Sequence, residues 1–190
     1  MSKSVCVYSA SSEAVDAVYL EAAAALGRQI GDAGWTMIFG GGTIGLMGAT
    51  ARGVHERGGT VIGVIPERLN RRGIAYEEAD EVVITETMRE RKAVMDEKSD
   101  AFIALPGGFG TLEELIEATT LKQLGYHDRP VVVLNTAGFF DPLLAFFDHQ
   151  VALRFVKPEH RELYHVAPTP EEGMEYIRSY RPTGSPEKFF

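Results

Sequence analysis

Arg91 occupies an unusual position for a charged side chain in this sequence. It lies three residues after Met88 and four before Met95, on the apolar stripe of a helix that the pattern predicts over about residues 88–98. A guanidinium on such a stripe loses its hydration unless it meets an anion. Arg91 is therefore expected to contact either a bound ligand or a core carboxylate, and Glu114 is the candidate partner in both cases.

The charged neighbours of Arg91 are less informative. Arg89 and Glu90 project away from the apolar stripe, and we interpret both as ordinary solvated residues. Lys92 borders the stripe, so its position alone leaves its role open.

Glu114 ends a glycine-rich segment, residues 106–114 (PGGFGTLEE), which follows an apolar run at 101–105. The segment is predicted to open a helix over about 111–124, whose first backbone N–H groups could bind a phosphate. Thr111 and Glu114 also have the T-x-x-E spacing of a capping box, in which Thr111 would cap the helix. Spacing alone leaves the capping and catalytic interpretations of Glu114 equally open.

A second glycine segment, residues 40–45 (GGGTIG), fits the pattern G-x-G-x-x-G between a predicted strand and a predicted helix. Its glycines could let the backbone approach a phosphate, with Gly42 as a candidate substrate contact, or could simply form a tight turn. Dinucleotide-binding domains usually carry this pattern after their first strand, with an acidic residue ending the next. Here it follows the second strand, and the next strand ends in Pro66, so NAD binding is disfavoured.

Apolar runs alternate with helical patterns along most of the chain, which predicts an α/β, Rossmann-like parallel sheet with helices on both faces. The predicted strands cover residues 5–8, 35–39, 60–65, 81–85, 101–105 and 130–135, and the predicted helices end near 33 or cover 45–57, 88–98, 111–124 and 139–155. Ligands bind such sheets beyond the carboxyl ends of the strands. Loops 9–12, 40–45 and 106–111 are therefore expected to form the site.

Length and composition limit the function classes. The 190 residues suggest a single domain over 1–180 followed by a loosely ordered tail at 181–190. A net charge of -8 disfavours a nucleic-acid partner, the single cysteine fits a reducing compartment, and no apolar run is long enough to span a membrane. We expect a cytoplasmic protein without a metal, because its five histidines have no convincing ligand spacing.

Several segments together resemble the LOG ("lonely guy") family of cytokinin riboside 5′-monophosphate phosphoribohydrolases. They are residues 40–48 (GGGTIGLMG), 61–66 (VIGVIP), 88–92 (MRERK), 99–114 and 123–125, so the resemblance covers most of residues 4–155. Many such sequences carry the label lysine decarboxylase, but no lysine here lies in an evident pyridoxal phosphate setting. The resemblance implies that Arg91 and Glu114 are catalytic. It also implies substrate contacts by Lys92, Gly107, Gly108, Phe109, Gly110, Thr111, Glu113 and Thr120.

This chain departs from the family pattern at a few positions. Gly73 stands where many members have a substrate-contacting glutamate, Leu121 replaces a common tryptophan, and residues 8–12 (YSASS) replace a Cys-Gly-Ser-Ser type loop. These departures concern base preference rather than the phosphate site or the chemistry.

The resemblance implies hydrolysis of the N-glycosidic bond of a purine nucleoside 5′-monophosphate, without a cofactor, to free base and ribose 5-phosphate. The base would be an N6-substituted adenine of the cytokinin type or, as in an AMP nucleosidase, adenine itself. A different class of function is a non-catalytic carrier of a nucleotide or phosphorylated cofactor. Apolar residues crowd the predicted helices at 111–124 and 139–155, which together with the family pattern suggests a homodimer.

Overall fold

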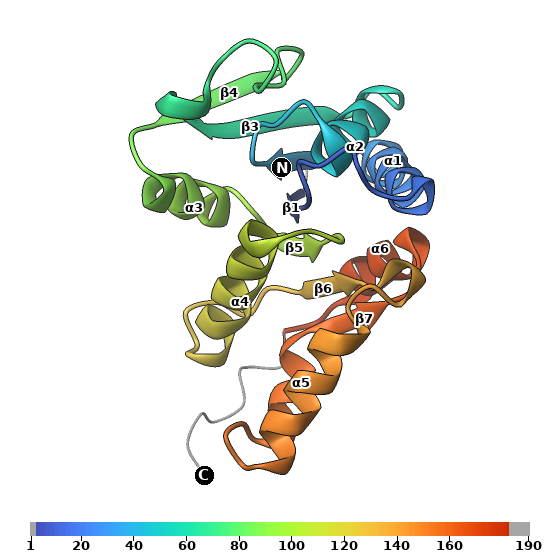
Figure 1. Cartoon of the computed structure of the whole chain (residues 1–190), viewed down its shortest axis with the longest axis vertical. Helices are drawn as coiled ribbons and strands as arrows, with labels where there is room; N and C mark the ends of the chain where they lie inside the picture. Colours follow the sequence, from blue (N-terminus) through green and yellow to red (C-terminus); the bar gives the residue numbers. More distant parts are fainter. Residues whose placement is uncertain (1–2, 183–190) are drawn as a thin grey trace.

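The computed structural model describes residues 3–182, which form one seven-stranded sheet flanked by helices (Figure 1). The strands are β1 (Ser4–Tyr8), β2 (Thr36–Phe39), β3 (Thr60–Pro66), β4 (Glu81–Thr85), β5 (Ala101–Ala104), β6 (Val131–Leu134) and β7 (His165–Ala167). They are ordered β4-β3-β2-β1-β5-β6-β7, and every pair of neighbours is parallel. The predicted Rossmann-like parallel sheet is confirmed.

Helices cover both faces of the sheet (Figure 1). One layer contains α1 (Ala17–Asp32), α2 (Gly45–His55) and α6 (Pro170–Ser179), and the other contains α3 (Met88–Glu97), α4 (Phe109–Gln123) and α5 (Asp141–Ala152). Alternate β1 residues enter different cores: Val5 and Val7 join the first layer, and Cys6 and Tyr8 join the second. Burial on both faces explains why the inner strands are continuous apolar runs.

The chain reverses direction across the sheet between β1 and β5. It runs outward from β1 to β4 and then returns to place β5 beside β1, so the crevice of the sheet lies at the carboxyl ends of these two strands. The Ala10 N–H donates to the Pro106 carbonyl at 3.3 Å, and the Met47 N–H donates to the Ala10 carbonyl at 3.3 Å. These bonds join the loop after β1 to the loop after β5 and to the first turn of α2.

Some details of the expected elements are wrong. Helix α4 begins at Phe109 with Gly108 as its N-cap and no side-chain cap, so the Thr111–Glu114 capping box does not form. Met88 does not point inward, since 47% of it is exposed. The predicted helix at 139–155 is shorter, because the short 3₁₀ turn η2 (Thr136–Gly138) comes before α5 begins at Asp141.

The last part of the chain contains elements that the sequence patterns do not predict. It holds η3 (Pro158–Leu163), the three-residue strand β7 and α6. The strand is too short to show periodicity, and Thr169 caps the helix behind it by accepting from the Glu172 N–H. Residues 183–190 of the predicted tail lie outside the described residues.

Candidate active site

Arg91 and Glu114 form a buried ion pair close to the crevice of the sheet. The Arg91 Nη1 donates to the Glu114 Oε1 at 2.8 Å, and only 7% of each side chain is exposed. Arg91 comes from the first turns of α3 and Glu114 from the second turn of α4, so the fold joins residues 23 positions apart. Of the two partners expected for Arg91, a bound ligand or a core carboxylate, the structure shows the carboxylate, which belongs to Glu114.

Backbone groups of the neighbouring strands hold the Arg91 guanidinium. Its Nε donates to the Val64 carbonyl of β3 at 3.0 Å, and its Nη2 lies against Gly40 at the end of β2. A Cβ atom on Gly40 would come within 1.9 Å of that Nη2. Only glycine fits at position 40, because any side chain there would clash with the guanidinium of Arg91. The glycine pattern of this loop did not indicate this role. Val64 contributes only a carbonyl, for which the sequence carries no signal.

Burial controls the proton affinity of Glu114. Removal from water raises the pKa of this carboxyl above 4.5, its ordinary value, while the adjacent Arg91 charge and hydrogen bond oppose the rise. A carboxylate with a raised pKa is a stronger base than an exposed glutamate. The pair therefore offers a desolvated negative charge that could accept a proton or stabilise a developing cation.

The glycine segment 106–111 forms the turn into α4. Gly107 packs against Thr111, because a Cβ on Gly107 would lie 2.1 Å from the Thr111 Oγ1. Gly108 and Gly110 differ, since a Cβ on either would meet no atom within 4 Å. The start of this helix therefore combines open space with first-turn N–H groups, and Glu114 is only four residues further along.

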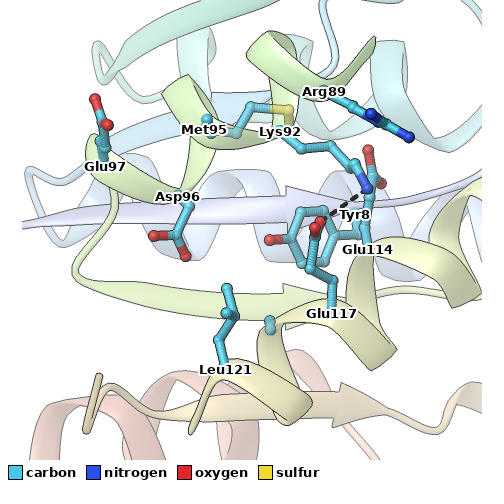
Figure 2. Close-up of a pocket in the computed structure, with 11 residues that line it drawn as sticks. Tyr8, Arg89, Lys92, Met95, Asp96, Glu97, Glu114, Glu117 and Leu121 are labelled. Atoms are coloured by element: carbon cyan, nitrogen blue, oxygen red, sulfur yellow. Dashed lines mark ion pairs between the residues drawn. The ribbon is translucent and has the colours of Figure 1, made fainter. Parts of the chain in front are cut away.

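A groove runs between α3 and α4 with Glu114 in its wall (Figure 2). It encloses about 240 Å³, and Tyr8 and Met95 also line it. Burial raises the pKa of the Tyr8 hydroxyl well above its ordinary range, so this phenol stays protonated. Tyr8 is the last residue of β1 and the first of residues 8–12, which depart from the family pattern. No feature of the sequence indicated that it would line the same groove as Glu114.

Lys92 bridges the two helices at the same groove. Its Nζ contacts Glu113 at 2.6 Å and Glu117 at 3.0 Å, as the dashed line to Glu117 in Figure 2 indicates in part. The hydrogen bond that Lys92 donates to the Glu113 carboxylate is the main cause that raises the pKa of Lys92. Two predicted substrate contacts, Lys92 and Glu113, are thus paired with each other next to the buried ion pair.

The remaining predicted contacts are more dispersed. Gly42 forms a backbone bridge with Ala75, and Phe109 lies at the start of α4 with 93% of its surface exposed. Thr120 is exposed on another side of α4 from Glu114, in a groove shared with α5. The fold of one chain therefore does not bring Thr120 to the buried pair.

Glu90 has a structural role that the sequence interpretation missed. Its N–H bonds the Thr87 hydroxyl at 3.2 Å, and its carboxylate accepts from the Thr87 N–H at 3.3 Å. This T-x-x-E capping box starts α3 just before Arg91. The same spacing at Thr111 forms no capping box, because helix α4 begins two residues earlier, at Phe109.

Membrane spans and metal clusters are both absent from residues 3–182. No helix in this range is long and apolar enough to cross a membrane. Nor do these residues include a cluster of three His, Cys, Asp or Glu side chains that could hold a metal ion.

Comparison with known proteins agrees with the motif resemblance. A family model described as possible lysine decarboxylase matches residues 47–177. The chain is 46% identical over 178 residues to the probable cytokinin riboside 5′-monophosphate phosphoribohydrolase LOGL2 of Oryza sativa subsp. japonica, covering 94% of this chain and 73% of that protein. It is 44% identical to the cytokinin riboside 5′-monophosphate phosphoribohydrolase LOG3 of Arabidopsis thaliana, covering 94% and 83%.

Solved structures show the same fold at lower identity. The Moco carrier protein of Chlamydomonas reinhardtii superposes with a TM-score of 0.70 at 26% identity, covering 94% of this chain and 96% of that chain. A molybdenum cofactor binding protein of Rippkaea orientalis has a TM-score of 0.72 at 24% identity, covering 94% and 97%. Since the LOG proteins share far more of the sequence over the same length, this chain belongs to the LOG family of cytokinin riboside 5′-monophosphate phosphoribohydrolases.

Proposed function

We propose that this protein is a phosphoribohydrolase that cleaves the N-glycosidic bond of a purine nucleoside 5′-monophosphate. The observation that carries the proposal is the buried Arg91–Glu114 pair, 2.8 Å apart, at the start of a glycine-opened helix. Relatives with 44–46% identity are named for this reaction on cytokinin nucleotides. The substrate class we propose is accordingly an N6-substituted adenosine 5′-monophosphate, with AMP as the unsubstituted alternative.

The proposed reaction is a displacement at C1′ of the ribose. As the C1′–N9 bond breaks, its electron pair leaves with the purine and the sugar gains oxocarbenium character. Ionised Glu114 stabilises that positive charge and takes a proton from the attacking water, whose oxygen bonds to C1′. The purine takes a proton from solvent, and Glu114 returns its own proton to solvent. Overall, one hydrogen of the water ends on the free base, and its OH group ends on ribose 5-phosphate.

The other residues have positioning and binding roles in this proposal. Arg91 favours the ionised form of Glu114 and holds its carboxylate in place through the bond from Nη1. The phosphate would bind the N–H groups of Gly108 to Thr111, where Gly108 and Gly110 border open space. Lys92 and Glu113, paired at 2.6 Å, would contact the ribose phosphate in this proposal.

A product assay tests the proposal. Wild-type protein is incubated with AMP and separately with isopentenyladenosine monophosphate, and free base and ribose 5-phosphate are measured by chromatography. Glu114→Gln should lower kcat by about 10² or more, the scale of one lost general base. The matched control is Glu175→Gln, which alters an exposed glutamate of α6 and should leave kcat unchanged. A folded Glu114→Gln protein with wild-type kcat would refute the assignment.

The likeness to Moco carrier structures supports a second candidate, a non-catalytic carrier of a phosphorylated cofactor. A carrier would bind its ligand at the same glycine loops and return it intact. The buried ion pair favours the hydrolase, because a desolvated carboxylate disfavours an anionic ligand unless it serves chemistry. Stoichiometric nucleotide binding without release of base would favour the carrier.

We also propose that the protein is a cytoplasmic homodimer formed through α4 and α5. Their apolar groove encloses about 440 Å³ and includes Ile116, Phe146 and Thr120. Ile116 is 40% exposed and Phe146 is 54% exposed, an arrangement that a second copy could cover. Thr120 would then contact substrate at the partner's site, which explains its distance from the buried pair. The buried, single Cys6 fits a reducing cytoplasm.

A further inference from the structure

The segment between β3 and β4 is attached to the first glycine loop by backbone hydrogen bonds. The Thr43 N–H donates to the Ile74 carbonyl at 2.9 Å, and the Tyr76 N–H donates to the Gly41 carbonyl at 2.8 Å. Gly42 and Ala75 form an isolated antiparallel bridge between these bonds. The glycine loop and residues 74–76 therefore form one small ladder, and neither part can move without the other.

Tyr76 anchors this ladder in the core. Only 3% of the residue is exposed, and its ring packs edge-on against Phe39, the last residue of β2, with 6.0 Å between ring centroids. Its hydroxyl lies 2.9 Å from the His55 Nδ1 and 3.2 Å from a Glu78 carboxylate oxygen. The tyrosine thus connects the ladder to a histidine of α2.

His55 lies between two fixed groups. Its ring stacks on Tyr76 at 5.7 Å with an interplanar angle of 27°, and its Nε2 lies 3.0 Å from the Asp80 Oδ2. The same Asp80 oxygen accepts from the Val61 N–H of β3 at 2.8 Å, and this bond is the main cause that lowers the pKa of Asp80. A charged carboxylate on the sheet therefore orients the imidazole, which in turn orients the tyrosine.

These contacts form a closed ring of linked residues that includes the glycine loop. The chain runs from the loop through α2 to His55, then by side chains to Tyr76, and back by the backbone bond to Gly41. Gly40, the neighbour of Gly41, is the residue against which the Arg91 Nη2 lies. Arg91 in turn donates to Glu114. His55 and Tyr76 are therefore linked to the buried ion pair only through the glycine loop.

We propose that His55 is a positioning residue for the reaction, which acts through Tyr76 and the glycine loop to hold the Arg91 guanidinium in place. The role rests on the proposed hydrolase function. It requires that disturbing the His55–Tyr76 contact lower kcat more than it raises KM, since the guanidinium orients the reacting carboxylate. It also requires that the effect disappear when Arg91 no longer has a guanidinium to position.

Two substitutions of His55 test the contacts of its two ring nitrogens separately. The side-chain amide of Asn occupies about the place of Nδ1, which faces Tyr76, whereas that of Gln occupies about the place of Nε2, which faces Asp80. We expect His55→Gln and Tyr76→Phe to lower kcat roughly tenfold, within the range that a small displacement at a reacting group produces. We expect His55→Asn to retain most of the activity, with KM changed by less than about twofold in all three variants.

The decisive measurement is a double-mutant cycle on kcat. Tyr76→Phe and His55→Gln are each combined with Arg91→Lys, and the expected outcome is no further loss beyond that of Arg91→Lys alone. A matched control is His165→Asn, since His165 also stacks on a tyrosine, Tyr176, at 4.0 Å but belongs to β7, outside this ring. Denaturation midpoints of all variants identify any loss of activity that follows from unfolding.

The outcomes distinguish this role from the proposed function. A wild-type protein that releases no base from any nucleotide overturns both. If the wild type is active but the losses of kcat from the Tyr76 and Arg91 substitutions multiply in the double variant, only the positioning role is overturned. Equal losses of kcat in His55→Asn and His55→Gln overturn it as well, because a packing effect would not separate the two nitrogens.

Discussion

At the scale of single residues, burial gives Glu114 a chemistry that its sequence position does not reveal. The residue is 6% exposed, and desolvation raises the pKa of its carboxyl despite the bond from Arg91. In the proposed reaction Glu114 must be ionised to accept a proton. Activity is therefore lost as pH falls through a pKa that lies above the ordinary glutamate value of 4.5.

The first prediction follows from the raised pKa of Glu114. The kcat of the wild type should show an acidic limb above the ordinary glutamate range, measured with a buffer series at constant ionic strength. Glu114→Gln should remove the limb together with most of the activity, because glutamine does not titrate. A residual activity in Glu114→Gln that keeps the same limb would assign the titration to another group.

The second prediction concerns stability at Arg91. Arg91→Ala leaves the Glu114 carboxylate buried without its cation, which costs about 3–5 kcal/mol in the free energy of unfolding at neutral pH. Losing the arginine raises the folded-state pKa of Glu114 further, so the folded variant prefers the protonated carboxyl, relative to the unfolded chain, more strongly than the wild type does. The variant should therefore lose less stability at about pH 5 than at about pH 7.5, as urea denaturation would measure.

At the scale of elements, the starts of helices decide where charged groups meet. The capping box of Thr87 and Glu90 fixes the first turn of α3, and Arg91 is the next residue. Helix α6 has a similar threonine N-cap at Thr169, which accepts from the Glu172 N–H but is remote from the ion pair. The two caps make a natural comparison between stability and activity.

The third prediction uses that comparison. Thr87→Ala and Thr169→Ala should each lower the free energy of unfolding by about 1 kcal/mol, because each removes one capping bond. Only Thr87→Ala should also lower kcat, since only α3 carries Arg91. Equal kcat values for the two variants would mean that the start of α3 does not control the position of the guanidinium.

The fourth prediction concerns the glycine-rich start of α4. A methyl group at Gly110 meets no atom within 4 Å, so Gly110→Ala should keep the fold and gain up to about 1 kcal/mol of stability from helix propensity. If phosphate binds the first-turn N–H groups, the same methyl should raise KM for the nucleotide. An unchanged KM in steady-state assays would show that the phosphate does not bind at this turn.

At the scale of the whole molecule, the α4–α5 face is an apolar surface that one chain leaves uncovered around Thr120. Exposed apolar side chains from both helices meet there, including Ile116 and Phe146. A dimer through this face would bury them and would bring each Thr120 near the other subunit. Activity would then depend on assembly.

The fifth prediction tests that dependence. Light scattering should give twice the chain mass of 20.8 kDa for the wild type. Phe146→Glu should give the single-chain mass and a lower kcat, because a charge in a desolvated interface is costly. Val18→Glu alters a 44% exposed residue of α1 in the opposite layer and should leave the mass doubled. A wild type with the mass of one chain would contradict the proposal.

The sequence by itself determined six of the seven strands, the parallel sense of the sheet and the need of Arg91 for an anionic partner. These features depend on local signals: apolar runs alternating with helical patterns, and a charge on an apolar stripe. Glu114 was a candidate partner at that stage, and the structure shows that the two side chains meet.

Only the tertiary structure decided which groups surround that pair. The Val64 carbonyl, the surface of Gly40 and the His55–Tyr76–Asp80 contacts join segments that are distant in the chain, so no local pattern indicates them. The capping interpretation of Thr111 and Glu114 stayed open for the same reason, since spacing cannot tell which T-x-x-E begins a helix, and the structure excludes it. Packing fixed where each helix begins, and burial set the proton affinity of Glu114.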